Sequence, residues 1–134
     1  MRPHRSTVAG VPRALPALLR AHRLSEKASR VGFDWERPSQ VLEKVEEELS
    51  ELRAAVELGE RAEVEAELGD VLFALTSLGR HLGIQAEDAL QRASDRFIRR
   101  FRYIEERLAA RQQDLHDTSA DEMNILWEEA KGKV

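Results

Sequence analysis

The chain has 134 residues, a length that suits one domain, with 42% hydrophobic residues, 34% charged residues and a net charge of −4. It contains no cysteine, which excludes disulfides, thiolate metal sites and a cysteine nucleophile. No apolar run is long enough to span a membrane, and the abundance of Leu, Ala, Glu and Arg favours helices. We expect an all-α protein, a bundle of four to five helices, and we place it in the cytoplasm.

Helix signals begin after an N-terminal lead, residues 1–12, which we expect to be flexible. The first helix is predicted over about residues 15–31 and stops at Gly32. The second begins at Pro38 and ends at Gly59, because glycine adopts the left-handed conformation without a steric penalty. These signals predict two helices joined by a short connector.

Three further helices follow. The third is predicted over about residues 61–82 and the fourth over about residues 85–113. The last begins at the capping box formed by Ser119 and Glu122. Residues 13–134 are therefore expected to form a single folded domain.

The second and third helices each carry an apolar stripe that we expect to face the core. The stripes consist of Val45, Leu49, Leu52 and Val56 on the second helix and of Leu68, Val71, Leu72, Leu75 and Leu82 on the third. Because each residue advances about 100° around a helix, Glu48 and Glu51 lie on one flank of the first stripe. Glu67 and Asp70 lie on the corresponding flank of the second stripe.

The short link at Gly59 predicts that these two helices pack antiparallel. Glu48 and Asp70 are equally far from Gly59 along the chain, and so are Glu51 and Glu67. Four carboxylates should therefore meet at one level and repel one another unless a cation neutralises them. Oxygen ligands favour Mg²⁺, with Mn²⁺ as a substitute. The alternative is that each acidic pair belongs to an ordinary exposed helix face.

The acidic residues also follow a known pattern. Residues 47–51 (EELSE) and 67–70 (ELGD) form the sequence EExxE…ExxD. This pattern resembles that of the MazG-like all-α nucleotide pyrophosphohydrolases. Residues 31–35, 69–74, 80–83 and 99–101 are similar to the catalytic C-terminal half of MazG, and the similarity extends from about Val11 to Lys131.

The resemblance implies hydrolysis of a nucleoside triphosphate to the monophosphate and pyrophosphate with Mg²⁺, in a homodimer or a dimer of dimers. It implies metal ligands at Glu48, Glu51, Glu67 and Asp70. A carboxylate, Glu47 or Glu51, is expected to take the proton of the attacking water, and the sequence leaves that choice open.

Basic residues supply candidates for binding phosphate. Arg96 and Arg100 border the apolar stripe of the fourth helix, and Lys44 lies between the two site acids of the second helix in angle. The family usually has Asn and Lys where this chain has Ser94 and Arg96, so the ligand preference is open.

Trp127 and Lys131 are candidates for covering the nucleotide base, and so is Trp35. Burial in the core is the alternative role for either tryptophan. His22 and His81 are expected to be structural or exposed.

Other functions are also compatible with part of the sequence. A non-enzymatic dimeric helical scaffold or regulator would use its acids only for solubility. A nucleic-acid partner is disfavoured because the arginines of residues 92–102 spread around the helix and the acidic hairpin repels phosphate. We expect no membrane partner. Within the enzyme class, a specialised nucleotide such as dUTP, dCTP or phosphoribosyl-ATP is a further alternative.

Overall fold

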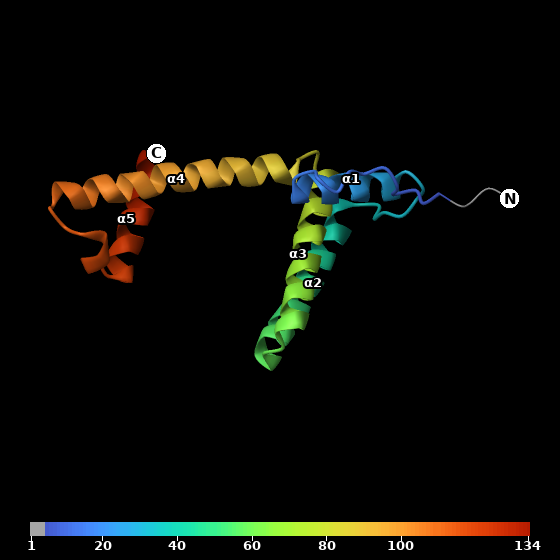
Figure 1. Ribbon diagram of the computed structural model, residues 1–134, viewed down its shortest axis with the longest axis horizontal. Coiled ribbons are helices and arrows are strands. Elements are labelled where there is room, and N and C mark those ends of the chain that lie inside the picture. The colour runs from blue at the N-terminus through green and yellow to red at the C-terminus, as the bar shows by residue number, and fades with distance from the viewer. Residues whose placement is uncertain (1–4) are drawn as a thin grey trace. The chain divides into compact units, whose positions relative to one another are not determined.

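The computed structural model describes residues 5–134, and within this range the chain is all-helical (Figure 1). Its helices are α1 (Ala17–Ser29), α2 (Pro38–Leu58), α3 (Arg61–His81), α4 (Ala86–Ala110) and α5 (Ala120–Lys133), with a 3-10 turn, η1 (Leu115–Asp117), before α5. The prediction of an all-α fold is confirmed. None of the helices in this range is both long enough and apolar enough to cross a bilayer.

The described chain divides into two compact units. The N-terminal unit ends at Ala89 and contains α1, α2, α3 and the first residues of α4. The C-terminal unit runs from Leu90 to Val134 and contains the remainder of α4, η1 and α5. The predicted acidic hairpin belongs to the N-terminal unit.

Local signals define the ends of α2 as the sequence predicts. The helix begins at Pro38, whose missing N–H is not needed in the first turn. The side chain of Gln40 accepts hydrogen bonds from the backbone N–H groups of Glu36 and Arg37 at 2.9 and 3.0 Å. The helix ends at Gly59, which has a φ of 75° and so adopts the left-handed conformation. The chain reverses there and enters α3.

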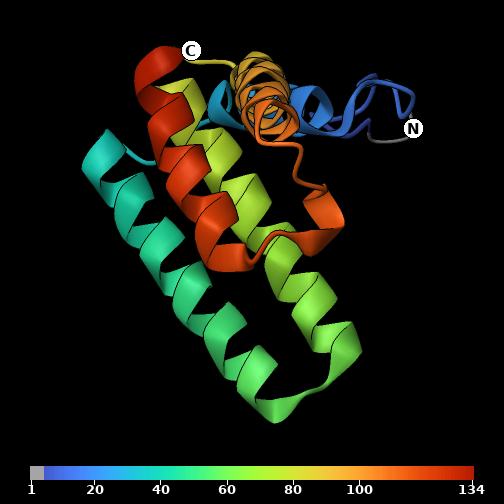
Figure 2. The same ribbon diagram turned by 90° about the vertical axis from the view of Figure 1, so that its left-hand side faces the viewer.

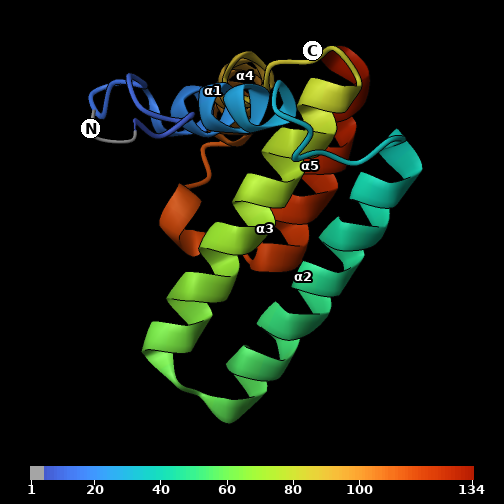
Figure 3. The same cartoon turned by 90° about the vertical axis from the view of Figure 1, so that its right-hand side faces the viewer.

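The α2–α3 hairpin is antiparallel, with the two helices side by side (Figure 3). Its seam is built from small side chains, since the buried apolar residues are Val41, Val45 and Ala55 on α2 and Val71 and Ala74 on α3. Small side chains allow the two helices to approach closely. The α1 helix packs against α3 at the end of the hairpin away from the Gly59 turn (Figure 3).

The predicted apolar stripes are partly wrong. Their larger residues are exposed, namely Leu49 and Val56 on α2, Leu68, Leu72 and Leu75 on α3, and Leu82 directly after α3. The seam is rotated toward the acidic flank, so that Glu48 is buried on α2. Ser77 of α3 is buried where its Oγ lies 3.2 Å from Ser25 Oγ of α1. Periodicity locates the apolar side of a helix, but the neighbouring helix decides which part of that side becomes buried.

The N-terminal lead contacts α1 in the part that the structure describes. The Lys27 ammonium group donates a hydrogen bond to the carbonyl oxygen of Ala9 at 2.8 Å. Residues 1–4 lie outside the described residues, and the flexibility of the lead stays a prediction.

In the C-terminal unit the chain leaves α4, passes through η1 and returns along α5 (Figure 2). The α4 helix ends at Ala110, three residues earlier than expected, and Gln112 then takes a positive φ of 55°. The predicted cap of α5 is present, because Ser119 Oγ accepts a hydrogen bond from the Glu122 backbone N–H at 3.1 Å. The buried apolar residues of this unit are Ile104, Leu108, Leu126 and Ala130.

Candidate metal centre

Three of the four predicted metal ligands converge across the α2–α3 hairpin. Glu48, from α2, and Glu67 and Asp70, from α3, each place one carboxylate oxygen so that the three oxygens lie within 4.8 Å of one another. The antiparallel register about Gly59 brings them to the same level. Converging carboxylate oxygens from two rigid helices form a donor set that suits a hard divalent cation.

Burial strengthens this fit. Glu48 is only 7% exposed, and its Oε1 lies 3.0 Å from Lys44 Nζ. Its Oε2 is buried without a hydrogen-bond donor among the described residues, and the same holds for Glu67 Oε2. A buried, unpaired carboxylate oxygen is costly unless a cation or a donor compensates it. The two orphaned oxygens therefore fit a bound metal.

Glu51 lies beside these acids but outside the group of three. Repulsion by Glu48 raises the pKa of Glu51, and burial and the charge of Glu67 add to the rise. Its carboxylate is exposed to solvent. Glu51 is therefore exposed to the negative charge of Glu48 and Glu67, and its roles as a metal ligand and as a proton acceptor stay predictions.

Lys44 and Glu47 border the acids on α2. Lys44 Nζ lies 3.4 Å from Glu47 Oε1, and its hydrogen bond to Glu48 raises the pKa of Lys44. Glu47 faces solvent more than Glu48 does, with 58% of its side chain exposed. Lys44 thus places a positive charge at the rim of the acidic site, and phosphate binding by Lys44 stays a prediction.

A network that the sequence did not predict holds the α1–α2 connector against α3. Asp34 Oδ1 lies 2.7 Å from both Arg80 and His81 nitrogens and accepts a hydrogen bond from the Trp35 backbone N–H at 2.9 Å. Arg80 Nε also donates to Ser25 Oγ at 2.9 Å. Burial raises the pKa of Asp34, but hydrogen bonds from Arg80, His81 and Trp35 outweigh it and lower that pKa to about 2.

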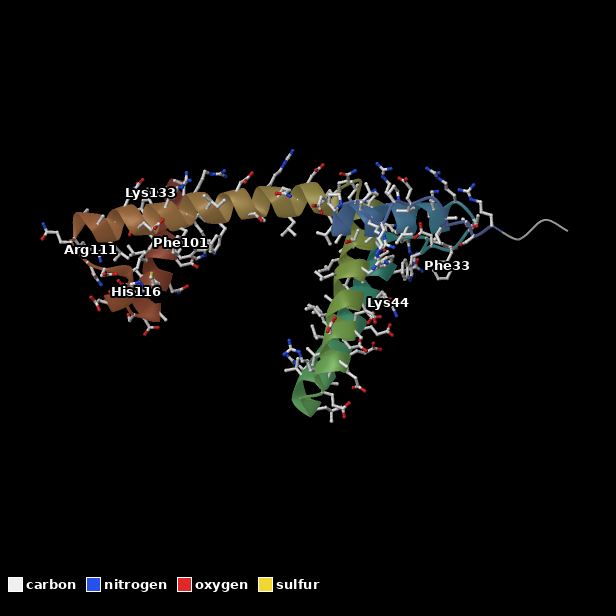
Figure 4. All side chains as sticks on the ribbon, in the orientation of Figure 1. Phe33, Lys44, Phe101, Arg111, His116 and Lys133 are labelled. Atoms are coloured by element: carbon white, nitrogen blue, oxygen red, sulfur yellow. The ribbon has the colours of Figure 1, made fainter. Side chains whose placement is uncertain are left out.

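This network, which we call the Asp34 latch (Asp34, Arg80, His81 and Ser25), determines where Trp35 lies. Trp35 lines a pocket of about 210 Å³ together with Lys44, Glu48 and Asp70. Figure 4 places Phe33, the neighbouring connector residue, on the side of the hairpin from which Lys44 projects. The sequence offered one signal for this network, an acid in the connector and the basic pair Arg80-His81. Asp34 lies 46 positions from Arg80 and 47 positions from His81, and no local rule pairs residues that far apart.

The remaining candidates belong to the C-terminal unit, where the structure brings some of them together. The Arg100 guanidinium group lies 5.5 Å from the centre of the Trp127 ring. The same ring is 5.5 Å from that of Phe97. Lys131 Nζ lies 3.3 Å from Glu128, and Arg96 is exposed. Phosphate or base binding by Arg96, Arg100, Trp127 and Lys131 stays a prediction.

Comparison with known proteins identifies the family. The model of the MazG nucleotide pyrophosphohydrolase domain matches residues 36–104, which include all four predicted metal ligands. The chain belongs to this family. The resemblance inferred from the acidic pattern is therefore confirmed.

Two relatives of the MazG family match over most of the chain. The nucleoside triphosphate pyrophosphohydrolase of Escherichia coli strain K12 is 41% identical over 128 residues, which are 94% of this chain and 49% of that protein. The nucleoside triphosphate pyrophosphohydrolase/pyrophosphatase MazG of Thermotoga maritima is 42% identical over 118 residues, which are 88% of this chain and 45% of that protein. The chain thus spans about half the length of these relatives.

Proposed function

We propose that the chain is a Mg²⁺-dependent nucleoside triphosphate pyrophosphohydrolase that releases the monophosphate and pyrophosphate. The observation that carries the proposal is the cluster of Glu48, Glu67 and Asp70, with two buried oxygens that lack a donor. Membership of the MazG family and the names of two relatives support the same reaction. The role of such an enzyme is housecleaning of the nucleotide pool in the cytoplasm.

In this proposal Glu48, Glu51, Glu67 and Asp70 hold the metal, with Mn²⁺ as a possible substitute for Mg²⁺. The ion, when bound, supplies Lewis-acid polarisation of a phosphoryl oxygen and lowers the pKa of a water. Water attacks the α-phosphorus, and the bond from that phosphorus to the bridging oxygen breaks as pyrophosphate leaves. The water proton passes to Glu47 or Glu51.

Positive side chains would neutralise the phosphates. Lys44 already lies 3.0 Å from Glu48 and can contact a phosphate at the rim of the site. We assign Arg96 and Arg100 the same task, and Trp127 and Lys131 the task of contacting the nucleotide. Mutation of each of these four residues to Ala, with pyrophosphate release measured, tests the assignment.

The partner is a second copy of the chain. On the flank of the hairpin opposite the acids, six apolar side chains are 44–58% exposed: Leu42, Leu49, Val56, Leu68, Leu72 and Leu75. We call this surface the leucine flank. A contiguous apolar patch on a protein of this size is typical of an interface, and heptad spacing suits packing against another helical hairpin. The resulting homodimer can pair again as a dimer of dimers.

The test measures thermal stabilisation by Mg²⁺ together with pyrophosphate release from a panel of common, damaged and specialised nucleoside triphosphates. We expect Glu48→Gln and Glu67→Gln to lose both signals while retaining helical circular dichroism. Glu46→Gln, which changes an exposed acid of α2 outside the acidic cluster, is the matched control and should behave as wild type. Absence of both signals in wild type would instead support the scaffold alternative.

The proton acceptor is tested separately. Removing the acceptor should abolish pyrophosphate release while leaving Mg²⁺ binding measurable by calorimetry. Glu47→Gln is expected to give this result if Glu47 is the base, whereas Glu51→Gln should weaken Mg²⁺ binding in either case because Glu51 is assigned as a ligand.

A further inference from the structure

Lys44 engages one of the two carboxylate oxygens of Glu48. Its Nζ lies 3.0 Å from Glu48 Oε1 and 3.4 Å from Glu47 Oε1, so two acids hold the ammonium group. Lys44 stands four residues before Glu48 and three before Glu47 on α2, the spacings at which side chains of a helix are neighbours. An ammonium group has three N–H donors, which leaves one for the phosphate contact proposed above.

The other oxygen of the same carboxylate is in the opposite situation. Glu48 Oε2 is buried and has no hydrogen-bond donor among residues 5–134, and the whole residue is only 7% exposed. Glu48 also belongs to the group of three acids whose oxygens lie within 4.8 Å of one another. An ion at this cluster is therefore offered one free oxygen of Glu48, because Lys44 already engages the second.

The number of oxygens that a carboxylate offers distinguishes Mg²⁺ from Ca²⁺. Mg²⁺ is small and requires a nearly octahedral arrangement, which single oxygens and waters satisfy. Ca²⁺ is larger, takes about six to eight oxygens and often binds both oxygens of one carboxylate. For Glu48 to bind in that way, Oε1 would have to leave Lys44. Breaking a hydrogen bond between charged groups corresponds to a factor of about ten in an equilibrium constant.

We propose that Lys44 makes the acidic cluster selective for Mg²⁺ over Ca²⁺, because it prevents Glu48 from binding an ion through both carboxylate oxygens. Lys44 is here a positioning residue, which determines the oxygen that Glu48 presents and does not itself contact the ion. Carboxylate oxygens suit both ions, so the acids alone do not make this choice. The proposal rests on the proposed function for the metal site and adds a determinant of metal choice to it.

The test measures the Kd of Mg²⁺ and the Kd of Ca²⁺ by calorimetry and compares their ratio between variants. Lys44→Met removes the ammonium group but keeps a long side chain, and it should shift the ratio about tenfold in favour of Ca²⁺. The loss of one positive charge acts alike on two divalent ions, so it cancels in the ratio. Lys44→Arg keeps a donor for Glu48 Oε1 and should keep the wild-type ratio.

Arg53→Met is the matched control. Arg53 is exposed on the same helix and does not line the pocket beside the acids, so the loss of its charge should leave the ratio unchanged. The side chain of Lys44 is 35% exposed, so its substitution empties no buried space, and helical circular dichroism checks that each variant is folded. The proposal is overturned if Lys44→Met leaves the ratio unchanged, or if Arg53→Met shifts it equally.

The same samples distinguish this inference from the proposed function. If wild type releases pyrophosphate with Mg²⁺ but the ratio of Kd values does not depend on Lys44, the inference is wrong and the proposed function stands. If the ratio depends on Lys44 but no triphosphate is hydrolysed, the metal selectivity stands and the proposed reaction is wrong. If wild type binds neither ion, both are wrong.

Discussion

Asp34 shows how one side chain can connect a loop to a distant helix. Its Oδ1 accepts hydrogen bonds from Arg80 and from the Trp35 backbone and lies 2.7 Å from His81 Nε2. These contacts stabilise the charged carboxylate more than burial disfavours it, so its pKa lies at about 2 rather than 3.8. The hydrogen bond from the Trp35 backbone ties Asp34 to a residue that lines the pocket beside the acids.

The lowered pKa of Asp34 predicts an acid-dependent loss of stability. A carboxylate with a depressed folded-state pKa stabilises the fold above its unfolded pKa, and the contribution is lost as the pH falls from about 4 to about 2. After a discount for solvent screening, Asp34→Asn should lower the free energy of unfolding at pH 7 by about 1 kcal/mol. Urea denaturation as a function of pH should show this difference vanish near pH 2.

The control for this measurement is Glu36→Gln, which removes an exposed carboxylate from the same connector. It should give a pH-independent difference close to zero. A difference for Asp34→Asn that stays constant down to pH 2 would contradict the assignment of the effect to its charge.

Glu51 illustrates the opposite situation, a carboxylate whose charge is unfavourable in the absence of a cation. Its pKa is raised, chiefly by repulsion from Glu48, so its ionisation destabilises the metal-free fold. Without Mg²⁺ at pH 7, Glu51→Gln should therefore raise Tm, and the gain should disappear as the pH falls below about 4. With saturating Mg²⁺ the same variant should show a smaller rise in Tm than wild type. Equal responses to Mg²⁺ would remove Glu51 from the ligand set.

At the scale of elements, the α2–α3 hairpin places acidic side chains and exposed apolar side chains on different flanks. The acids lie on one flank of the seam and the leucine flank lies on the other. Since both helices turn through about 100° per residue, a single antiparallel register places Glu48, Glu67 and Asp70 together and the residues of the leucine flank on the other side. The Gly59 turn is what fixes that register.

Gly59 has a φ of 75°, a conformation in which a side chain is strained. Gly59→Ala should lower the free energy of unfolding by about 1 kcal/mol, measured by chemical denaturation. Gly59→Asn is the conservative control and should lose less, because asparagine tolerates the left-handed region better than alanine. No Cβ contact within 4 Å opposes either substitution, so a larger loss would point to a cause other than backbone conformation.

At the scale of the whole molecule, the leucine flank leaves six apolar side chains about half exposed to solvent. A second copy that covers it removes that surface from water, which favours association by about 25 cal/mol for each Å² buried. A dimer built in this way leaves the acids of each copy free on the opposite side, where substrate has access.

The association predicts a concentration-dependent Tm for wild type. Leu72→Glu should abolish that dependence and shift the mass measured by light scattering toward that of the monomer. Leu58→Glu is the control, since Leu58 is exposed near the turn and outside the leucine flank, and it should retain the wild-type mass. A monomeric wild type with a concentration-independent Tm would contradict the proposed partner.

The sequence by itself determined the helices and the meeting of the acids. Helix ends depend on nearby residues such as Pro38, Gly59 and Ser119, and these signals act within a few positions. The register of Glu48 with Asp70 follows from their equal distance to the turn, which needs only the pitch of a helix. Local information was sufficient for both.

Only the tertiary structure decided which residues are buried and what surrounds the acids. Val41, Val71 and Ala74 form the seam in place of the larger leucines, because the closest approach of two helices depends on the partner as much as on periodicity. The contact of Asp34 with Arg80 joins residues 46 positions apart, and no local rule selects that pair. Long-range packing therefore decided the surroundings of the acids, among them Trp35 and Phe73, whereas local geometry had already assembled the acids.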